Sequence, residues 1–323
     1  MSFEVRDLVK SYGDKVVVDH LNLKMDQPGV YALLGTNGAG KTTSLRMILG
    51  MLKKDGGEVF YNGKEMEPAN MNIGYLAEER GLYPKYSLID QLLYFAKLKG
   101  VSKSDAMERI KHWSQRLELD EYLFPQKTAK GKAPKPKLAD QLSKGNQQKI
   151  QLMAALISDP EFIVLDEPMS GLDPVNTDLF KEVIREEIAK DKYVIMSSHQ
   201  MPTIEEFCTD ITILNHGKTV LQGKLDEIKK SYGRVNLFVK CEGDIARLIE
   251  KEGLPIVEKL PSEYHLRVTG ETQAMQFLKK LIDADVTIIR FELREPSLHE
   301  IFVEKVSGDD EERAEEGVID EKE

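Results

Sequence analysis

Nine consecutive residues near the N-terminus have the types and spacing of a phosphate-binding loop. The run Gly-Thr-Asn-Gly-Ala-Gly-Lys-Thr-Thr starts at residue 35 and fits the pattern G-x-x-x-x-G-K-[ST]. Its glycines let backbone N–H groups curve around phosphate oxygens, and the following helix N-terminus adds partial positive charge. Lys41 would reach the β and γ phosphates of a nucleotide, and the Thr42 hydroxyl would hold Mg²⁺. The candidate nucleotide-binding residues are Gly35, Thr36, Asn37, Gly38, Ala39, Gly40, Lys41, Thr42 and Thr43.

Two adjacent acids, Asp166 and Glu167, have the chemistry that hydrolysis of a bound nucleotide needs. They follow the apolar run Phe-Ile-Val-Leu at residues 162–165, which is typical of a buried strand. At the end of such a strand, Asp166 could bind Mg²⁺ directly or through water. Glu167 would point differently and could polarise the attacking water as a general base. Because acids are common at strand ends, the pair indicates a nucleotide site only together with the phosphate loop.

A parallel β-sheet is the element that would bring these residues together. The apolar run at residues 30–34 leads into the glycine loop, and residues 42–52 then have the apolar spacing of a helix. Further short apolar runs predict buried strands at residues 162–165, 194–197 and 211–214. Strands that alternate with helices in this way predict an α/β fold with a parallel-sheet core.

The 323-residue chain is long enough for one large domain and one small domain. We expect a nucleotide-binding domain at residues 1–228 and a small α+β domain at residues 233–306, with a hinge at residues 229–234. Strands predicted at residues 235–240, 264–268 and 286–292 give the small domain a βαβαβ-like order. Residues 307–323 hold nine acidic and two basic side chains, which predicts an acidic, disordered tail.

Composition excludes several other classes of protein. The net charge is −10, of which the acidic tail contributes −7, so the body is not the basic surface of a nucleic-acid binder. No stretch approaches the roughly 18 apolar residues of a membrane-spanning helix. Charged residues near the N-terminus exclude a secretory signal, and Cys208 and Cys241 form neither a metal-ligand pattern nor a disulfide framework. These features predict a cytoplasmic protein without a nucleic-acid partner.

Four further features resemble motifs of ABC transporter ATP-binding subunits. Residues 142–147 (Leu-Ser-Lys-Gly-Asn-Gln) resemble the ABC signature, residues 170–173 the D-loop and residues 197–199 the H-switch. Tyr12 matches the aromatic residue that stacks on adenine. The resemblance covers residues 1–223, and it implies a P-loop NTPase domain of the ABC type with a helical signature subdomain. It also implies that the nucleotide is ATP, bound with Mg²⁺.

The resemblance implies a site that two subunits share. In the family, the signature covers the γ-phosphate bound by the other subunit, and its residues here are Ser143, Lys144, Gly145 and Asn146. Asp173 would report across the interface, while His199 would hold the γ-phosphate and order the water beside Glu167. Two ATP molecules would join a homodimer, or a pair of related ATPase subunits, and hydrolysis would release it.

The chain departs from the family pattern at two places. Glu78 stands where the Q-loop has glutamine, and a carboxylate there could still coordinate Mg²⁺ but adds negative charge near the γ-phosphate. The signature reads Ser-Lys-Gly-Asn rather than Ser-Gly-Gly-Gln. Each motif residue also has an ordinary structural interpretation: Tyr12 as a packing residue, His199 as a helix cap and Ser143 as a plain N-cap.

The C-terminal part resembles the small extension of NatA-like, ABC-2-type bacterial exporter ATPases. This resemblance covers about residues 233–306. It implies a peripheral protein on the cytosolic face of the membrane that drives export of sodium, antibiotic or lipid-like cargo through an integral membrane permease. The segment after Glu78, with Tyr83 and Tyr86, would line the groove that receives the permease.

Two other classes of protein remain as alternatives. A non-transport ABC ATPase would act on a ribosome or a nucleic-acid machine, but such proteins usually have two cassettes or long coiled coils, and this chain has one phosphate loop and no sustained heptads. A phosphate-loop kinase or GTPase would not explain the signature or His199.

Overall fold

The chain divides into two compact units. The computed structural model describes residues 2–78, 81–125 and 135–320, with side chains up to residue 309. The first unit comprises Met1–Gln200 and Phe207–Gln222, and the second comprises Met201–Glu206 and Gly223–Glu323. We expected a hinge at residues 229–234. The boundary lies earlier, because helix α8 (Leu225–Tyr232) occupies most of that segment and belongs to the second unit.

A six-stranded sheet forms the centre of the first unit, in the order β10-β9-β3-β8-β7-β6. Its strands are β3 (Gly29–Gly35), β6 (Ile73–Leu76), β7 (Phe162–Asp166), β8 (Tyr193–Ser198), β9 (Asp210–Asn215) and β10 (Lys218–Lys224). The pairs from β9 to β6 are parallel. Strands β3, β7 and β8 are buried along their whole length, which is why their sequences are continuous apolar runs. The predicted parallel-sheet core is confirmed.

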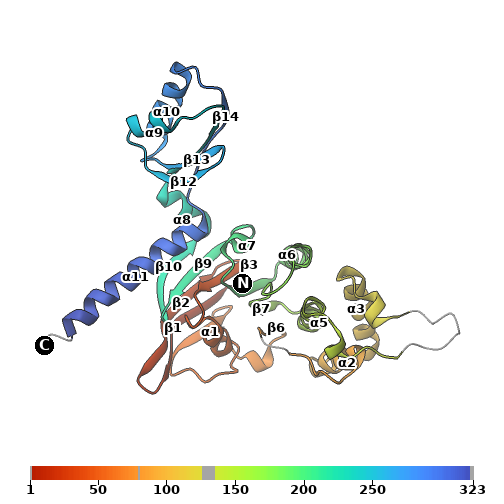
Figure 1. Cartoon of the computed structure of the whole chain (residues 1–323). Coiled ribbons are helices and arrows are strands. Elements are labelled where there is room, and N and C mark those ends of the chain that lie inside the picture. The colour runs from red at the N-terminus through yellow and green to blue at the C-terminus, as the bar shows by residue number, and fades with distance from the viewer. Residues whose placement is uncertain (1, 79–80, 126–134, 321–323) are drawn as a thin grey trace. The chain divides into compact units, whose positions relative to one another are not determined.

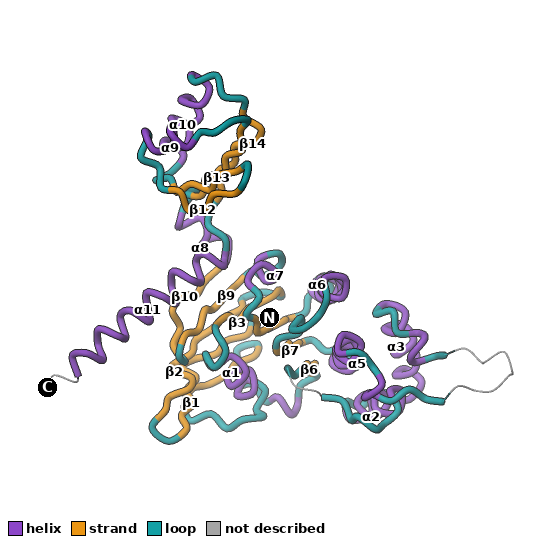
Figure 2. The backbone as a smooth tube through the Cα atoms, in the orientation of Figure 1, coloured by secondary structure: helices purple, strands orange, loops and turns teal. Residues whose placement is uncertain are grey.

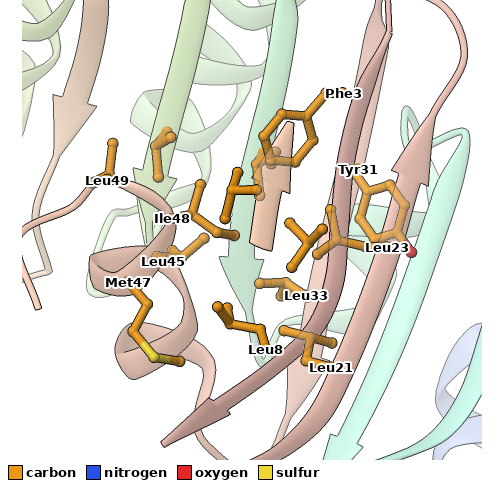
Figure 3. Packing of buried hydrophobic residues seen from close by; sticks show 14 of the residues in the cluster. Phe3, Leu8, Leu21, Leu23, Tyr31, Leu33, Leu45, Met47, Ile48 and Leu49 are labelled. Atoms are coloured by element: carbon orange, nitrogen blue, oxygen red, sulfur yellow. The ribbon is translucent and has the colours of Figure 1, made fainter. Parts of the chain in front are cut away.

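A second, antiparallel sheet packs on the first. It has the order β2-β1-β4-β5, formed by β1 (Phe3–Tyr12), β2 (Lys15–Met25), β4 (Gly56–Tyr61) and β5 (Lys64–Glu65). Apolar residues of β1 and β2, among them Phe3, Leu8 and Leu21, form one core with Leu33 of β3 and with helix α1 (Lys41–Ile48), as Figure 3 shows. Since buried side chains pack at near-crystalline density, this core fixes helix α1, and with it one end of the glycine loop.

The other helices of the first unit form a second group. They are α2 (Leu88–Leu98), α3 (Lys103–Arg116), α4 (Asp120–Leu123), α5 (Lys144–Leu156) and α6 (Pro174–Ile188), with 3-10 helices at Pro68–Asn70 and Ala139–Gln141. Helix α2 packs on α3 and α5 (Figure 1). Helix α4 packs on α3. This group is the expected helical subdomain. Ser87, Ser102 and Ser143 cap α2, α3 and α5, because each hydroxyl accepts from the N–H three residues further on.

The second unit contains a four-stranded antiparallel sheet with two helices on one face (Figure 2). The chain order is β11 (Asn236–Cys241), α9 (Ala246–Lys251), β12 (Ile256–Leu260), β13 (Glu263–Arg267), α10 (Glu271–Asp283) and β14 (Ile288–Arg294). This βαββαβ order has one strand more than the predicted βαβαβ-like order. Strand β12 was missed because all of its residues are exposed at a sheet edge, so it has no buried apolar run.

The acidic C-terminal segment differs from the expected disordered tail. Helix α11 runs from Leu298 to Asp320, so it includes residues 307–320 of that tail. Residues 321–323 lie outside the described residues. The segment is rich in glutamate and contains alanine and arginine but no proline, and these residues have good helix propensity. None of the helices in the described part of the chain is long and apolar enough to cross a membrane.

Candidate nucleotide-binding site

The glycine loop connects the end of β3 to the start of α1, where a phosphate-binding loop must lie. Gly40 caps the helix with a φ of 101°, a left-handed conformation that disfavours a side chain. A Cβ on Gly40 would also lie 2.5 Å from the carbonyl oxygen of Val17. The glycine is therefore required both by backbone conformation and by the close approach of β2.

The loop lines a cavity of about 260 Å³. Its lining residues are Val17, Asn37, Gly38, Ala39, Gly40, Lys41, Thr42, Thr43, Glu78 and Glu167. Most of the predicted phosphate-loop residues therefore share one cavity with two predicted acidic residues. This is the arrangement that a triphosphate and its attacking water require.

Lys41 places its ammonium group under the loop. The side chain is 6% exposed, and Nζ donates to the carbonyl oxygens of Gly35 at 2.9 Å and Thr36 at 3.2 Å. It also lies 3.4 Å from Glu167 Oε1. A buried cation that is held mainly by neutral carbonyl groups can exchange them for phosphate oxygens, with which it forms stronger, charge-assisted hydrogen bonds.

Asp166 ends strand β7 as a fully buried carboxylate. Its Oδ1 accepts from Ser197 Oγ at 2.6 Å and from Thr42 Oγ1 at 3.1 Å, while Oδ2 has no hydrogen-bond partner. Burial raises the pKa of Asp166 above its usual value, the hydrogen bonds from Ser197 and Thr42 oppose that rise, and the charge of Glu167 adds to it. A buried carboxylate oxygen without a partner, next to a threonine hydroxyl, fits a hard cation that takes oxygen ligands.

A site for Mg²⁺ with a nucleotide does not need a cage of protein ligands. In the part of the chain that the structure describes, no group of three or more His, Cys, Asp or Glu side chains is arranged to hold a metal. Mg²⁺ commonly takes one or two protein oxygens and completes its shell with phosphates and water. Thr42 and Asp166 fit that minimal set.

Glu167 and His199 form a second pair at the same sheet edge. Strands β7 and β8 are parallel neighbours, so the residues that follow them lie side by side. Glu167 has a φ of 48°, which turns its carboxylate away from that of Asp166, and its Oε2 lies 2.9 Å from His199 Nδ1. Glu167 is 5% exposed, and its Oε1 makes no hydrogen bond. The imidazole therefore orients a carboxylate whose other oxygen, Oε1, makes no hydrogen bond and lies 3.4 Å from Lys41 Nζ.

Ser197 has a positional role that the motif comparison did not assign. It pairs with Asp166 across β7 and β8. Its hydroxyl donates to Asp166 and accepts from the backbone N–H of Glu167 at 2.9 Å, so one side chain holds both acids. Only the pairing of the two strands, together with their register, could have revealed this role.

Glu78 follows strand β6 and lines the same cavity as an exposed residue. Residues 79–80 lie outside the described part of the chain. The geometry brings Glu78 to the site, and its role as a metal ligand stays a prediction.

The remaining predicted residues do not line the cavity. Ser143 caps α5 by accepting from the N–H of Asn146 at 3.2 Å, and Asp173 caps α6 in the same way with Asn176 at 3.0 Å. The hydrogen bonds from Asn176 lower the pKa of Asp173. These helix N-termini are neighbours, because a Cβ on Gly145 would lie 3.3 Å from Asn176 Nδ2.

Tyr12 also lies outside the cavity lining. It ends strand β1, is 54% exposed, and its ring centroid is 5.2 Å from Lys10 Nζ. An exposed ring of this kind is open to stacking by a planar base. Tyr12, Ser143, Lys144, Gly145, Asn146 and Asp173 therefore keep their assignments as predictions.

A phosphate-loop nucleoside triphosphatase is defined by two features that are both present here. One is a strand that leads through a glycine loop into a helix, and the other is a pair of acids at the end of another parallel strand of the same sheet. Residues 18–170 match the family model described as "ABC transporter", and residues 223–306 match "ATP-binding protein DrrA1-3-like, C-terminal domain". The chain is 40% identical over 300 residues to the uncharacterized ABC transporter ATP-binding protein YhaQ of Bacillus subtilis (strain 168). The aligned residues cover 93% of this chain and 96% of YhaQ.

Two further comparisons agree with this match. The bacitracin transport ATP-binding protein BcrA of Bacillus licheniformis is 29% identical over 313 residues, covering 94% of this chain and 96% of BcrA. A solved structure of the ATP-binding subunit of an ABC transporter superimposes with a TM-score of 0.63 at 27% identity, over 72% of this chain and 93% of that one. The chain belongs to the family of ABC transporter ATP-binding proteins, which hydrolyse ATP to power transport. The predicted family, fold and ATPase activity are confirmed.

Proposed function

We propose that the chain is the ATPase subunit of an exporter, which pairs with a second ATPase subunit around two ATP molecules and drives a separate membrane permease from the cytosolic face. The pairing of two subunits is supported by the separation of the predicted site residues into two groups. The phosphate loop, Asp166 and Glu167 gather at one cavity, whereas the signature residues and Asp173 cap helices outside its lining. A second subunit would supply the missing donors to the γ-phosphate.

This chain supplies the metal ligands, the general base and the phosphate-binding lysine of the hydrolytic step. Mg²⁺, when bound at Thr42 and Asp166, would neutralise charge on the phosphate oxygens. Glu167 would accept a proton from the attacking water, and Lys41 would hold the phosphate oxygens. His199, at 2.9 Å from Glu167, would keep that carboxylate oriented and contact the γ-phosphate. The products are ADP and phosphate.

Export is supported by the relatives of the chain. BcrA is named for bacitracin transport, and proteins 29–31% identical to this chain are named as Nod factor export ATP-binding protein I in Cupriavidus and other bacteria. We extend export to this chain on that basis. The classes of cargo, an antibiotic, a lipid-like molecule or sodium, are those that the resemblance of the sequence implies.

An exposed aromatic surface beside a cavity supports docking of a permease on the first unit. Tyr83, Tyr86 and Tyr94 are 49%, 63% and 48% exposed, and Tyr83 lies 5.6 Å from Tyr86 between ring centroids. Leu82 precedes Tyr83 in the sequence and Phe95 follows Tyr94, and both line a cavity of about 350 Å³. Exposed apolar side chains gathered in this way mark interaction surfaces.

Capture of the partner tests the proposal. Affinity-tagged chain purified from gently solubilised membranes should bring a membrane-spanning protein with it, and Tyr86→Glu should lose that protein without loss of ATP binding. Met51→Glu is the matched control, because Met51 is equally exposed, at 63%, on the same unit. Recovery of ribosomes or nucleic acid instead of a membrane protein would favour a non-transport ABC ATPase.

A further inference from the structure

Helix α7 (Met201–Glu205) begins two residues after His199 but does not belong to the unit that contains His199. The first unit ends at Gln200, and residues 201–206 group with the C-terminal residues. Within the second unit, α7 packs against the start of α11. The segment that follows the histidine is therefore held by the C-terminal part of the chain.

Glu205 makes the polar contacts of this attachment. Its Oε1 accepts from Lys229 Nζ of helix α8. Its Oε2 accepts from the backbone N–H of Leu298, the first residue of α11, at 3.1 Å. Both side chains of the ion pair are 23% exposed, so solvent screens them only in part. One carboxylate thus joins α7 to two helices of the second unit.

The contact between Glu205 and Leu298 completes the N-terminal cap of helix α11. Ser297 and Glu300 form a reciprocal cap, since the N–H of Glu300 donates to Ser297 Oγ and the N–H of Ser297 donates to Glu300 Oε2. The N–H of Leu298 is one of the donors that a helix leaves unpaired at its N-terminus, and Glu205 satisfies it. A negative charge is also favoured there by the helix dipole.

The link from α7 back to His199 is short and constrained. Only Gln200 separates His199 from Met201, and the N–H of Gln200 donates to Ser198 Oγ at 2.9 Å. Met201 and Ile204 are 3% and 0% exposed, so α7 is anchored by buried side chains as well as by Glu205. A displacement of α7 must be absorbed within one residue or move the imidazole.

We infer that Glu205 is a positioning residue: by holding α7, which begins two residues after His199, it keeps the imidazole at its 2.9 Å distance from Glu167. The inference rests on the proposed role of His199. A loose α7 would let His199 leave Glu167 and the γ-phosphate, whereas Lys41 and the glycine loop would still bind ATP. The contacts of Glu205 thereby affect the rate of hydrolysis rather than the affinity for nucleotide.

Steady-state ATPase kinetics test the inference. Glu205→Ala should lower kcat by roughly tenfold, since an ångström of misplacement in a reacting group has an effect of this order or more. The KM for ATP should stay within about twofold, because ground-state contacts are unchanged. Glu304→Ala is the matched control: Glu304 also joins α11 to α8, by accepting from Tyr232 Oη at 3.2 Å, but it does not touch α7. Its kcat should remain near that of the wild type.

A double-mutant cycle with His199→Ala separates positioning from general loosening. If Glu205 acts through His199, Glu205→Ala should cause no further loss of kcat in the His199→Ala background. If Glu205→Ala does not fold, Glu205→Gln replaces it in both backgrounds, because its amide oxygen still accepts from Leu298 while the ion pair with Lys229 is lost.

Two results would overturn the inference. One is a wild-type kcat in a folded Glu205 variant, and the other is an undiminished effect of that variant in the His199→Ala background. An inactive wild-type chain would instead contradict the proposed ATPase mechanism, so the two failures are distinguishable.

Discussion

At the scale of single residues, the site places three carboxylates near one phosphate cavity. Asp166 is fully buried, Glu167 is nearly so, and Glu78 lines the same cavity from the exposed side. The ammonium group of Lys41 lies 3.4 Å from Glu167 Oε1. Like charges in a region of low dielectric raise one another's free energy, so a cation bound beside these carboxylates would lower it.

Asp166→Asn should stabilise the nucleotide-free protein while it abolishes ATP hydrolysis. Burial raises the pKa of Asp166 in the folded state, so the folded protein binds its proton more tightly than the unfolded chain does. The free energy of unfolding therefore falls as pH rises from the pKa of Asp166 in the unfolded chain to its pKa in the folded protein. Above the folded-state pKa, the ionised carboxylate destabilises the fold by its full amount. Asparagine removes this penalty at neutral pH, and we expect an unfolding temperature about 2 °C higher.

Thermal unfolding from about pH 4, the ordinary pKa of an aspartate, to pH 8, without nucleotide or Mg²⁺, provides the measurement. The advantage of Asp166→Asn should shrink toward acid pH, where the wild-type carboxylate takes up its proton. An asparagine variant that is less stable than the wild type at pH 7 would show that the hydrogen bonds from Ser197 and Thr42 outweigh desolvation.

Glu78→Gln should leave ATP binding intact and raise the Mg²⁺ concentration for half-maximal ATPase activity, by roughly twofold to fivefold. The reason is that a carboxylate attracts a hard divalent cation more strongly than an amide does. Titrations with Mg²⁺ and Mn²⁺ on both proteins give the comparison. Superimposable curves would mean that Glu78 is not a metal ligand.

At the scale of elements, the parts that could be predicted are those with a strong local signal. The continuous apolar runs of β3, β7 and β8 predict strands, and the glycine loop and the pair Asp166-Glu167 are placed by those strands. Ser197 could not be assigned, because its role depends on the register between β7 and β8. Strand β12 is an exposed edge strand, and α7 is a single short turn whose position depends on distant residues.

The buried face of α10 should determine the stability of the second unit. Phe277 is 1% exposed in the core of this unit, and Phe277→Ala should destabilise it by about 3–5 kcal/mol through the lost burial and the cavity that remains. Met275, in the same helix, is 60% exposed, so Met275→Ala should cost less than about 0.5 kcal/mol. Chemical denaturation of both variants measures the difference, and equal effects would contradict the placement of α10.

At the scale of the whole molecule, nucleotide should control association. Glu167→Gln keeps the size of the side chain but removes the proposed base, so it should bind ATP, hydrolyse it slowly and accumulate as a dimer. The wild type without nucleotide should be monomeric, since each chain has a net charge of −10 and only ATP would bridge the two. Size-exclusion chromatography with light scattering distinguishes these states.

Lys41→Ala provides the control for this association. It removes the cation of the phosphate site and should lose ATP binding, so a Lys41→Ala, Glu167→Gln double variant should remain monomeric with ATP. A tight dimer in the absence of nucleotide would contradict the proposal and would indicate permanent dimerisation through the second unit.

Because of the path that the chain takes between its two compact units, neither unit can be removed or transferred as a single segment. The chain passes from one unit to the other three times, after Gln200, after Glu206 and after Gln222. A truncation at Gln222 would therefore leave α7 in the polypeptide while removing α8 and α11, the helices that Glu205 contacts. A graft of residues 223–323 onto another ATPase would lack α7 in the same way. Neither unit is therefore continuous in the sequence, because α7 of the second unit lies between the strands β8 and β9 of the first.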